Sequence, residues 1–308
     1  DRAVQDRIAP IVYPMLGIQE APGTPAWRND FDHAPMAYLS EHVVTGMAVL
    51  PAAGYVESLL ELATIQCPEA NAYSVRDFQI MAPLLLVGDR GLDCVTSYEP
   101  VSQTAIIRGL ENGRLGGGQM HITARLSGHT NPGSDREDLA AIRGQFDRAE
   151  DIRGFYQMLD RMGLSYGPMF QTVRELFVSE SSDRILAHIA IASELEKGLD
   201  QYCLHPTLLD ACFQSLSAML GESENMYLPT SIREITVFRN SSPQAIWCLG
   251  IKTHQDSRFI DCDLVLMDED GEVVAILRGM RSTAATKRER TDNFGDRVKR
   301  QILGYQWN

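Results

Sequence analysis

His42 stands in an apolar segment that is bounded by a glycine and a proline. The spacing is His-x3-Gly-x4-Pro, from His42 through Gly46 to Pro51. Apolar surroundings withhold water from an imidazolium ion, so they favour the neutral imidazole. A neutral imidazole can remove a proton from a carbon beside a carbonyl group, which makes His42 a candidate general base. Taken alone, a histidine before an apolar helix is more often a hydrogen-bonded core residue, so catalysis needs a second group.

A carboxyl group in another apolar helical run is that second group. Asp210 lies within residues 204–214, and Gln214 follows one helical turn later on the same helix face. An apolar environment disfavours the carboxylate, so it raises the pKa of Asp210 and keeps the group protonated. Asp210 is therefore a candidate general acid, and Gln214 either orients it or caps a polar patch. A neutral base and a neutral acid across a cavity suit elimination or isomerisation.

The residues around these groups predict an α+β fold in two similar halves. Apolar positions at i, i+3, i+4 and i+7 predict a helix over residues 52–63, directly after the His42 segment. Alternation of apolar and polar residues, as over 260–264, predicts antiparallel strands with one buried face. The strands expected in the first half are 72–80, 84–87, 92–98 and 119–126. The second half is expected to hold helices over 152–162 and around Asp210, and strands over 173–178, 185–191, 232–238, 245–253, 259–267 and 273–281.

A polar, turn-rich stretch over residues 128–135 is the best candidate for a boundary between the halves. We therefore expect an N-terminal half over 1–130, which carries His42, and a linker over 131–149. A C-terminal half over 150–286 carries Asp210, and residues 287–308 are expected to form a charged exit linker. The chain starts without methionine or a secretory signal, which suggests a piece of a longer polypeptide.

Composition argues against several classes of function. A net charge of −13 disfavours nucleic-acid binding, which needs clustered lysine and arginine. No apolar run is long enough to span a membrane, and no Gly-x-Gly-x2-Gly segment follows a strand to bind a nucleotide. The seven histidines lack metal-ligand spacing, so no metal site is expected. The six cysteines form no Cys-x2-Cys pair and fit apolar patterns, which predicts free thiols and a cytoplasmic location.

Four motifs, in this order, resemble the dehydratase domains of modular or iterative polyketide synthases. They are His-x3-Gly-x4-Pro at His42, Tyr-Gly-Pro at 166–168, Asp-x3-Gln at Asp210 and Leu-Pro at 228–229. Trp27 and the terminal residues 304–307 also match that family, so the resemblance covers essentially the whole chain. The chain departs from the family pattern at Ser165, where a glycine usually precedes the Tyr-Gly-Pro triplet.

The resemblance implies a double hot-dog fold, in which two antiparallel sheets each wrap around a long central helix. Two such units side by side would place His42 and Asp210 at their junction. The implied reaction is a hydro-lyase reaction, the loss of water from a β-hydroxyacyl thioester to give a trans α,β-unsaturated thioester. His42 would remove the α-proton, and Asp210 would protonate the departing hydroxyl group.

The resemblance also implies how the substrate arrives. It would come on the phosphopantetheine arm of an acyl carrier protein, so the domain itself would bind no cofactor. The implied partners are this carrier protein and neighbouring synthase domains, without nucleic acid or membrane, and a homodimer is left open. An acidic carrier would need basic residues near the tunnel entrance. Arg278 and Arg281 are candidates, unless they belong to a solvated strand face.

The remaining assignments concern the walls of the expected tunnel. The helix that begins near Pro51 offers the free N–H groups of Ala52 and Ala53 to the thioester oxygen. Ordinary packing explains the residues expected to form the tunnel walls equally well. These are Gly46, Leu50, Pro51, Leu228 and Pro229.

Two points stay open in the sequence. Tyr166 either presents its hydroxyl group to the substrate or belongs, with Gly167 and Pro168, to a rigid turn. The same acid and base could also shift a double bond or close a pyran ring, and the domain could be an inactive scaffold. A hot-dog thioesterase is disfavoured, because it needs a carboxylate that activates water without an opposing histidine.

Overall fold

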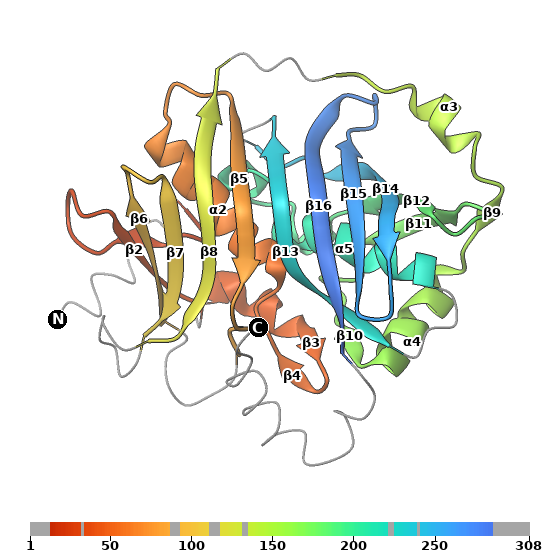
Figure 1. Ribbon diagram of the computed structural model, residues 1–308, viewed down its shortest axis with the longest axis horizontal. Coiled ribbons are helices and arrows are strands. Elements are labelled where there is room, and N and C mark those ends of the chain that lie inside the picture. The colour runs from red at the N-terminus through yellow and green to blue at the C-terminus, as the bar shows by residue number, and fades with distance from the viewer. Residues whose placement is uncertain are drawn as a thin grey trace.

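Strands from both halves of the chain join into one antiparallel sheet (Figure 1). Within the described residues its thirteen strands run in the order β1-β2-β6-β7-β8-β5-β13-β16-β15-β14-β12-β11-β9. The first-half strands are β1 (Ile18–Gln19), β2 (Ala26–Asp30), β5 (Ala72–Ile80), β6 (Asp93–Glu99), β7 (Thr104–Gly109) and β8 (Met120–His129). The others are β9 (Arg148–Ala149), β11 (Val173–Val178), β12 (Arg184–Ala190), β13 (Met226–Val237), β14 (Ala245–Gln255), β15 (Phe259–Met267) and β16 (Val273–Ala285).

The structure, a computed structural model, describes residues 13–31, 34–86, 93–110, 118–130, 135–220, 225–238 and 241–285. The expected exit linker over 287–308 lies outside these ranges, and so do the terminal residues 304–307 that contribute to the resemblance. Within the described ranges, no helix combines the length and the apolar character that are needed to cross a membrane.

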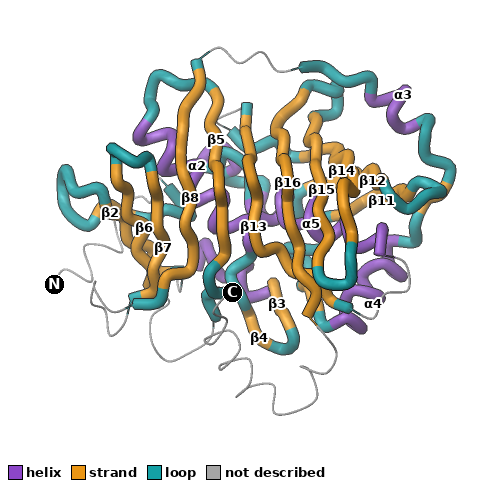
Figure 2. The backbone as a smooth tube through the Cα atoms, viewed as in Figure 1, coloured by secondary structure: helices purple, strands orange, loops and turns teal. Residues whose placement is uncertain are grey.

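The pairing of β5 with β13 forms a seam between the halves. Its antiparallel register runs from Tyr73 opposite Val237 to Gln79 opposite Ser231. The two expected sheets are therefore continuous with one another, and the resulting sheet curves around the central helices (Figure 2).

Two buried helices fill the concave side of the sheet. Helix α2 (Ala52–Gln66) packs on β5 and β8, helix α5 (Pro206–Ser215) packs on β12 and β14, and the two helices contact each other. Apolar residues surround most of α2, as expected for a helix that is buried on all sides. Proline in the first turn favours the start of α5, and the His205 side chain caps it by accepting the N–H of Thr207.

Short 3-10 helices connect several of these elements. They are η1 (Ala34–Glu41), η2 (Ser193–Leu195), η3 (Leu199–Gln201) and η4 (Leu216–Leu220). Helix η1 ends directly before His42, and η4 directly continues α5. Both therefore lie next to a predicted catalytic element.

The segment between the halves packs on the convex face of the sheet. Helix α3 (Leu139–Arg143) begins at Asp138, whose side chain caps it, and Ile142 is buried against the second-half strands. Ile142 packs with Leu186 of β12. The residues on either side of Leu186 belong to the core around the central helices, because successive side chains of a strand point to opposite faces. In the described part of the expected linker, residues 135–149, Ile142 and Phe146 thus pack on the outer face of the second half, while residues 148–149 add β9 to the sheet edge.

The strand predictions differ from the structure in several places, among them the start of β13, which is at Met226 instead of residue 232. Residues 84–86, the described part of the expected strand over 84–87, form only an isolated bridge between Leu85 and Val49. Strand β7 was not predicted, and the segment that holds His42 is a short strand instead of a loop. Pairing with other segments, which the pattern within one segment does not report, decides these outcomes.

Candidate active site

A second, three-stranded sheet joins the two halves at the site. Strand β3 (His42–Val44) pairs with β4 (Met47–Ala48) of its own half and with β10 (Leu164–Tyr166) of the other half. The antiparallel register of β3 and β10 sets Tyr166 opposite His42. The two rings meet edge to face, with 5.5 Å between their centroids. This cross-half pairing fixes the position of the His42 backbone.

The hydrogen bond made by His42 defines which of its nitrogens can act as a base. Nδ1 lies 2.9 Å from the carbonyl oxygen of Val49. A carbonyl oxygen only accepts, so Nδ1 carries the proton and donates it. In the neutral ring Nε2 then holds a free lone pair. This nitrogen lies 3.7 Å from Oδ1 of Asp210, and the His42 residue is 8% exposed.

Asp210 lies in the middle of α5 and is 5% exposed. Its Oδ2 accepts a hydrogen bond of 2.8 Å from Nε2 of Gln214, which also donates to the carbonyl oxygen of Phe170 at 3.2 Å. Burial raises the pKa of Asp210, although His42 and the Gln214 hydrogen bond oppose the rise. A raised pKa favours the protonated carboxyl group, which is the form that can act as an acid. The roles of Asp210 and Gln214 stay predictions.

Gln214→Leu should shift the alkaline limb of the rate profile to higher pH. The Gln214 amide stabilises the charged form of Asp210, so its removal raises the pKa of Asp210 further. Activity that needs the acid form is lost as the pH rises through this pKa, and that loss should therefore occur at higher pH in the variant. The measurement is kcat against pH for both proteins. An unchanged or downward-shifted limb would contradict the assignment of the limb to Asp210.

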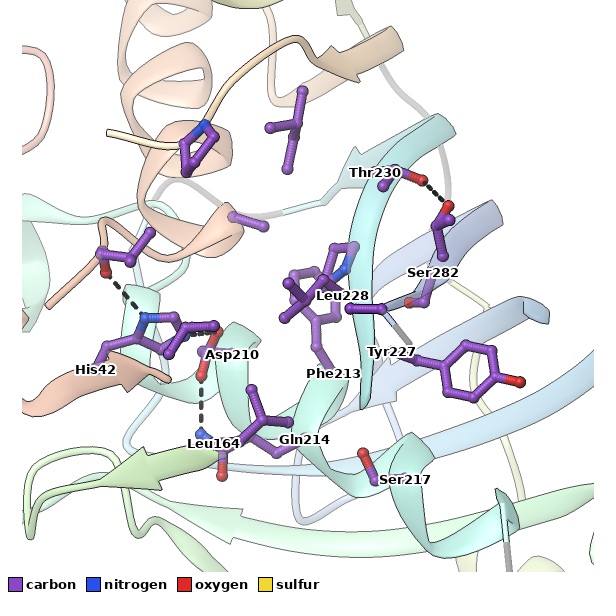
Figure 3. A pocket seen from close by; sticks show the side chains of 18 of the residues that line it. His42, Leu164, Asp210, Phe213, Gln214, Ser217, Tyr227, Leu228, Thr230 and Ser282 are labelled. Carbon is purple, nitrogen blue, oxygen red and sulfur yellow. Dashed lines mark hydrogen bonds and ion pairs between the residues drawn. The ribbon is translucent and has the colours of Figure 1, made fainter. Parts of the chain in front are cut away.

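An apolar cavity of about 260 Å³ surrounds the pair (Figure 3). His42 and Asp210 point toward one another from opposite halves, and Phe213 and Leu228 form an apolar wall beside them. Eight of the predicted residues line this cavity: His42, Leu50, Ala52, Tyr166, Asp210, Gln214, Leu228 and Pro229. The other five predicted residues, Gly46, Pro51, Ala53, Gly167 and Pro168, are not among the residues that line it.

Gly46 and Gly167 serve turns next to the cavity. Thr45 and Gly46 have φ values of 50° and 83° in the β3–β4 hairpin, a conformation that favours glycine. The N–H of Gly167 donates to the carbonyl oxygen of Glu41, and a Cβ at Gly167 would collide with the Glu41 carboxyl group. Pro168 follows in the same turn and is exposed. The contacts of Gly167 fit the turn interpretation, and Tyr166 lines the cavity. Presentation of the Tyr166 hydroxyl group to the substrate stays a prediction.

The N-terminus of α2 lies in the cavity wall. Pro51 is buried and precedes the helix, and its carbonyl oxygen accepts the N–H of Gly54 at 2.9 Å. Ala52 lines the cavity, whereas the side chain of Ala53 is fully buried in the core. The first N–H groups of an α-helix lack the acceptor four residues earlier, so this end can stabilise negative charge. The use of the Ala52 and Ala53 N–H groups by a thioester oxygen stays a prediction.

Sequence reasoning missed three groups that shape the site. The carbonyl oxygens of Val49 and Phe170 orient His42 and Gln214, but every residue has a carbonyl, so no residue type signals them. Tyr55 also lines the cavity, and its hydroxyl oxygen accepts the N–H of Leu84 at 2.9 Å. A tyrosine in the first turn of a largely apolar helix was the available signal for that residue.

A buried glutamate connects the two central helices. Glu57 of α2 is fully buried, and its two oxygens accept the N–H groups of Cys203 at 2.6 Å and Leu204 at 2.9 Å. Burial raises the pKa of Glu57 to about 8, although these hydrogen bonds oppose the rise. Cys203 and Leu204 directly precede the capping residue of α5. Glu57 therefore ties the helix that follows His42 to the start of the helix that carries Asp210.

Glu57→Gln should lower both stability and turnover. The amide leaves a buried N–H without its acceptor, which typically costs about 1–3 kcal/mol. Glu61 offers a matched control, because it is equally buried one turn later but accepts the N–H groups of Met15 and Leu16. Glu61→Gln should lose similar stability while its kcat stays near that of the parent protein. Denaturant unfolding and turnover would be measured together, and equal losses of kcat would contradict a special role for Glu57.

The fold is that of a double hot-dog domain, with His42 and Asp210 facing one another in a cavity at the junction of its halves. A dehydratase domain of a trans-AT polyketide synthase from Brevibacillus brevis superimposes with a TM-score of 0.80 at 21% identity, covering 90% of this chain and 100% of that one. The dehydratase domain of a mycocerosic acid synthase-like polyketide synthase gives a TM-score of 0.77 at 25% identity, covering 90% and 99%. These similarities confirm the predicted fold.

Sequence comparison identifies the family. Residues 134–292, more than half of the chain, match the family described as "Polyketide synthase dehydratase N-terminal domain", and residues 14–106 match "Polyketide synthase dehydratase domain". The chain belongs to the polyketide synthase dehydratase family. It is 26% identical over 312 residues to a mycocerosic acid synthase-like polyketide synthase of Mycobacterium tuberculosis, covering 96% of this chain and 14% of that protein. A protein of the same description from Mycolicibacterium smegmatis is 29% identical, covering 88% of this chain and 13% of the relative. The chain thus spans about one seventh of these relatives.

Proposed function

We propose that this domain removes water from a β-hydroxyacyl thioester carried on the phosphopantetheine arm of an acyl carrier protein. The product would be a trans α,β-unsaturated thioester, which makes the domain a hydro-lyase. The observation that carries the proposal is the pair formed by His42 Nε2 and Asp210 Oδ1, 3.7 Å apart in an apolar cavity. The separation is longer than a hydrogen bond, and both groups face the cavity where a substrate carbon chain would lie.

The geometry supports different roles for His42 and Asp210 in the proposed reaction. The lone pair of His42 Nε2 removes the α-proton, and the electrons of that C–H bond move toward the thioester carbonyl. The N-terminus of α2 at Ala52 is placed to stabilise the negative charge on the carbonyl oxygen. Asp210 gives its proton to the β-hydroxyl group as the C–O bond breaks, so that water leaves and the double bond forms. Return of the proton from His42 to Asp210, directly or through the released water, restores both groups.

The proposed partners follow from the family and from this chemistry. The relatives are long synthases of which this chain matches one segment, which supports neighbouring synthase domains and a carrier protein as partners. The proposed acid and base both come from the chain, so the reaction as written needs no bound cofactor. All six cysteines are free, in keeping with the cytoplasmic location that we propose. A homodimer stays part of the proposal.

The test is a mass-spectrometric assay of carrier-bound β-hydroxyacyl chains of several lengths and both β-configurations. The proposal expects loss of the mass of one water from at least one of them. Chromatography against synthetic standards would separate the α,β-unsaturated product from a shifted double bond or a pyran. Failure with every stereoisomer, by a folded protein, would favour an inactive scaffold domain.

A further inference from the structure

A second hollow lies on the surface beside helix α4 (Ile152–Met162), with a volume of about 680 Å³. Arg153 and Arg161 contribute to it from α4, and Arg174 contributes from β11. Gln157, between the two helix arginines, and Gln171 add neutral hydrogen-bonding groups. We call this site the arginine hollow.

The charges in the arginine hollow are not neutralised by neighbours. Within the described part of the chain, none of its three arginines forms an ion pair with a carboxylate. The guanidinium group of Arg174 is held in place by the carbonyl oxygens of Gln171 and Ala190. The one acidic residue that lines the hollow, Asp160, accepts a hydrogen bond from Ser165. In a chain of net charge −13, such a concentration of free positive charge needs an explanation.

Several arginines elsewhere on the described surface do pair with carboxylates. Arg76, Arg125 and Arg143 each pair with a carboxylate from another element. Arg278 and Arg281, which the sequence suggested as carrier-binding residues, pair with Asp263 and Asp261 across β15 and β16. The charges of these two arginines are therefore offset by aspartates on the neighbouring strand. The arginine hollow is the better candidate for binding an anion.

The arginine hollow adjoins the catalytic cavity. Tyr166 lines both sites, with its ring against His42 on the cavity side. The end of α4 also touches the β3–β4 hairpin, where the N–H of Thr45 donates to the carbonyl oxygen of Gly163 at 2.7 Å. An extended substrate that occupies the cavity could therefore place an anionic group in the hollow.

We propose that the arginine hollow binds the phosphodiester group of the phosphopantetheine arm while the acyl thioester lies in the catalytic cavity. This inference rests on the proposed function. Guanidinium groups form paired, charge-assisted hydrogen bonds with phosphate oxygens, and three of them can surround one phosphate. The interaction is the same before and during the reaction, so it lowers the KM without raising kcat.

Three thioesters of one β-hydroxyacyl chain test the proposal: the pantetheine, the phosphopantetheine and the carrier-bound forms. In the variant Arg153→Gln/Arg161→Gln we expect the KM of the two phosphate-bearing forms to rise about tenfold, equivalent to 1.4 kcal/mol of binding, with kcat within twofold. The KM of the pantetheine form should not change. Arg174→Gln should act in the same direction.

The control is Arg108→Gln, which removes one positive charge, as Arg174→Gln does, from an exposed arginine of β7 at the opposite end of the molecule (Figure 1). It should leave all three KM values unchanged. An equal rise in the KM of the pantetheine form would show that the helix arginines shape the cavity. An unchanged KM of the phosphopantetheine form would show that the hollow does not bind the phosphate. Either result overturns the proposal. A rise confined to the carrier-bound form would also overturn it, because the hollow would then contact the carrier surface instead of the phosphate.

Binding separates this inference from the proposed reaction. Calorimetric titration with unacylated phosphopantetheine and with pantetheine requires no turnover. The parent protein should bind the phosphorylated compound about tenfold more tightly, and the Arg153→Gln/Arg161→Gln variant should lose this difference. If the parent protein dehydrates no substrate but still binds the phosphorylated compound more tightly, the proposed reaction is refuted and the proposed phosphate site is supported. Equal binding of the two compounds by the parent protein would refute the phosphate site.

Discussion

His42→Phe should remove dehydration while the domain stays folded. Phenylalanine keeps a ring where His42 packs against Tyr166 and Phe170, at 5.5 Å from each, but it cannot accept a proton. General base catalysis contributes about 10²–10⁴-fold to a rate, so kcat should fall by about that factor. The measurement is initial-rate loss of water from a carrier-bound or pantetheine thioester. Turnover within tenfold of the parent would exclude His42 as the base.

A control is needed because His42 is buried and donates to the carbonyl oxygen of Val49. The variant leaves the carbonyl oxygen of the buried Val49 without this donor, which costs about 1–3 kcal/mol of stability. Thermal unfolding should therefore show a small decrease in Tm with a cooperative transition. If the variant is inactive but unfolds cooperatively, the loss of activity is due to the loss of proton abstraction and not to unfolding.

Asp210→Asn should be nearly as inactive, for a different reason. Asparagine preserves the volume of the side chain, and its oxygen can still accept the hydrogen bond from Gln214. It cannot give a proton to the departing hydroxyl group, so we expect kcat to fall by about 10²–10⁴-fold. Normal dehydration by Asp210→Asn would move the acid role to Tyr166 or to a bound water.

Exchange of the substrate α-proton in deuterated water distinguishes the two variants. His42 stays in place in Asp210→Asn, so that protein should still exchange the α-proton while it fails to release water. His42→Phe should do neither. Exchange at the parent rate in His42→Phe would mean that another group abstracts the α-proton.

Much of the architecture could be predicted because the local pattern and the final packing agree. Strands β5, β11 and β15 have the predicted bounds. Helix α4 also matches, because it starts at the capping residue Asp151 and ends at Gly163 with φ of 93°. Such end signals are local, so they can be read without knowledge of the fold.

The site was predictable in its chemical groups but not in its geometry. His42 and Asp210 were recognised by residue type and setting, whereas the tautomer of His42 depends on the carbonyl oxygen of Val49. Strands β3 and β10 are each three residues long and pair across more than a hundred residues, so neither has a pattern of its own. The role of Glu57 likewise depends on backbone groups 146 and 147 residues further along the chain.

The seam has a consequence for how this domain folds during synthesis. When residues 1–130 have left the ribosome, β5 can pair with β8, but its other edge has no partner until β13 is made. For that interval the nascent half presents an open strand edge that includes the apolar residues Val75 and Phe78. Open apolar edges promote pairing with foreign chains. Rapid completion of the second half, or a chaperone that covers β5, therefore protects the emerging domain from aggregation.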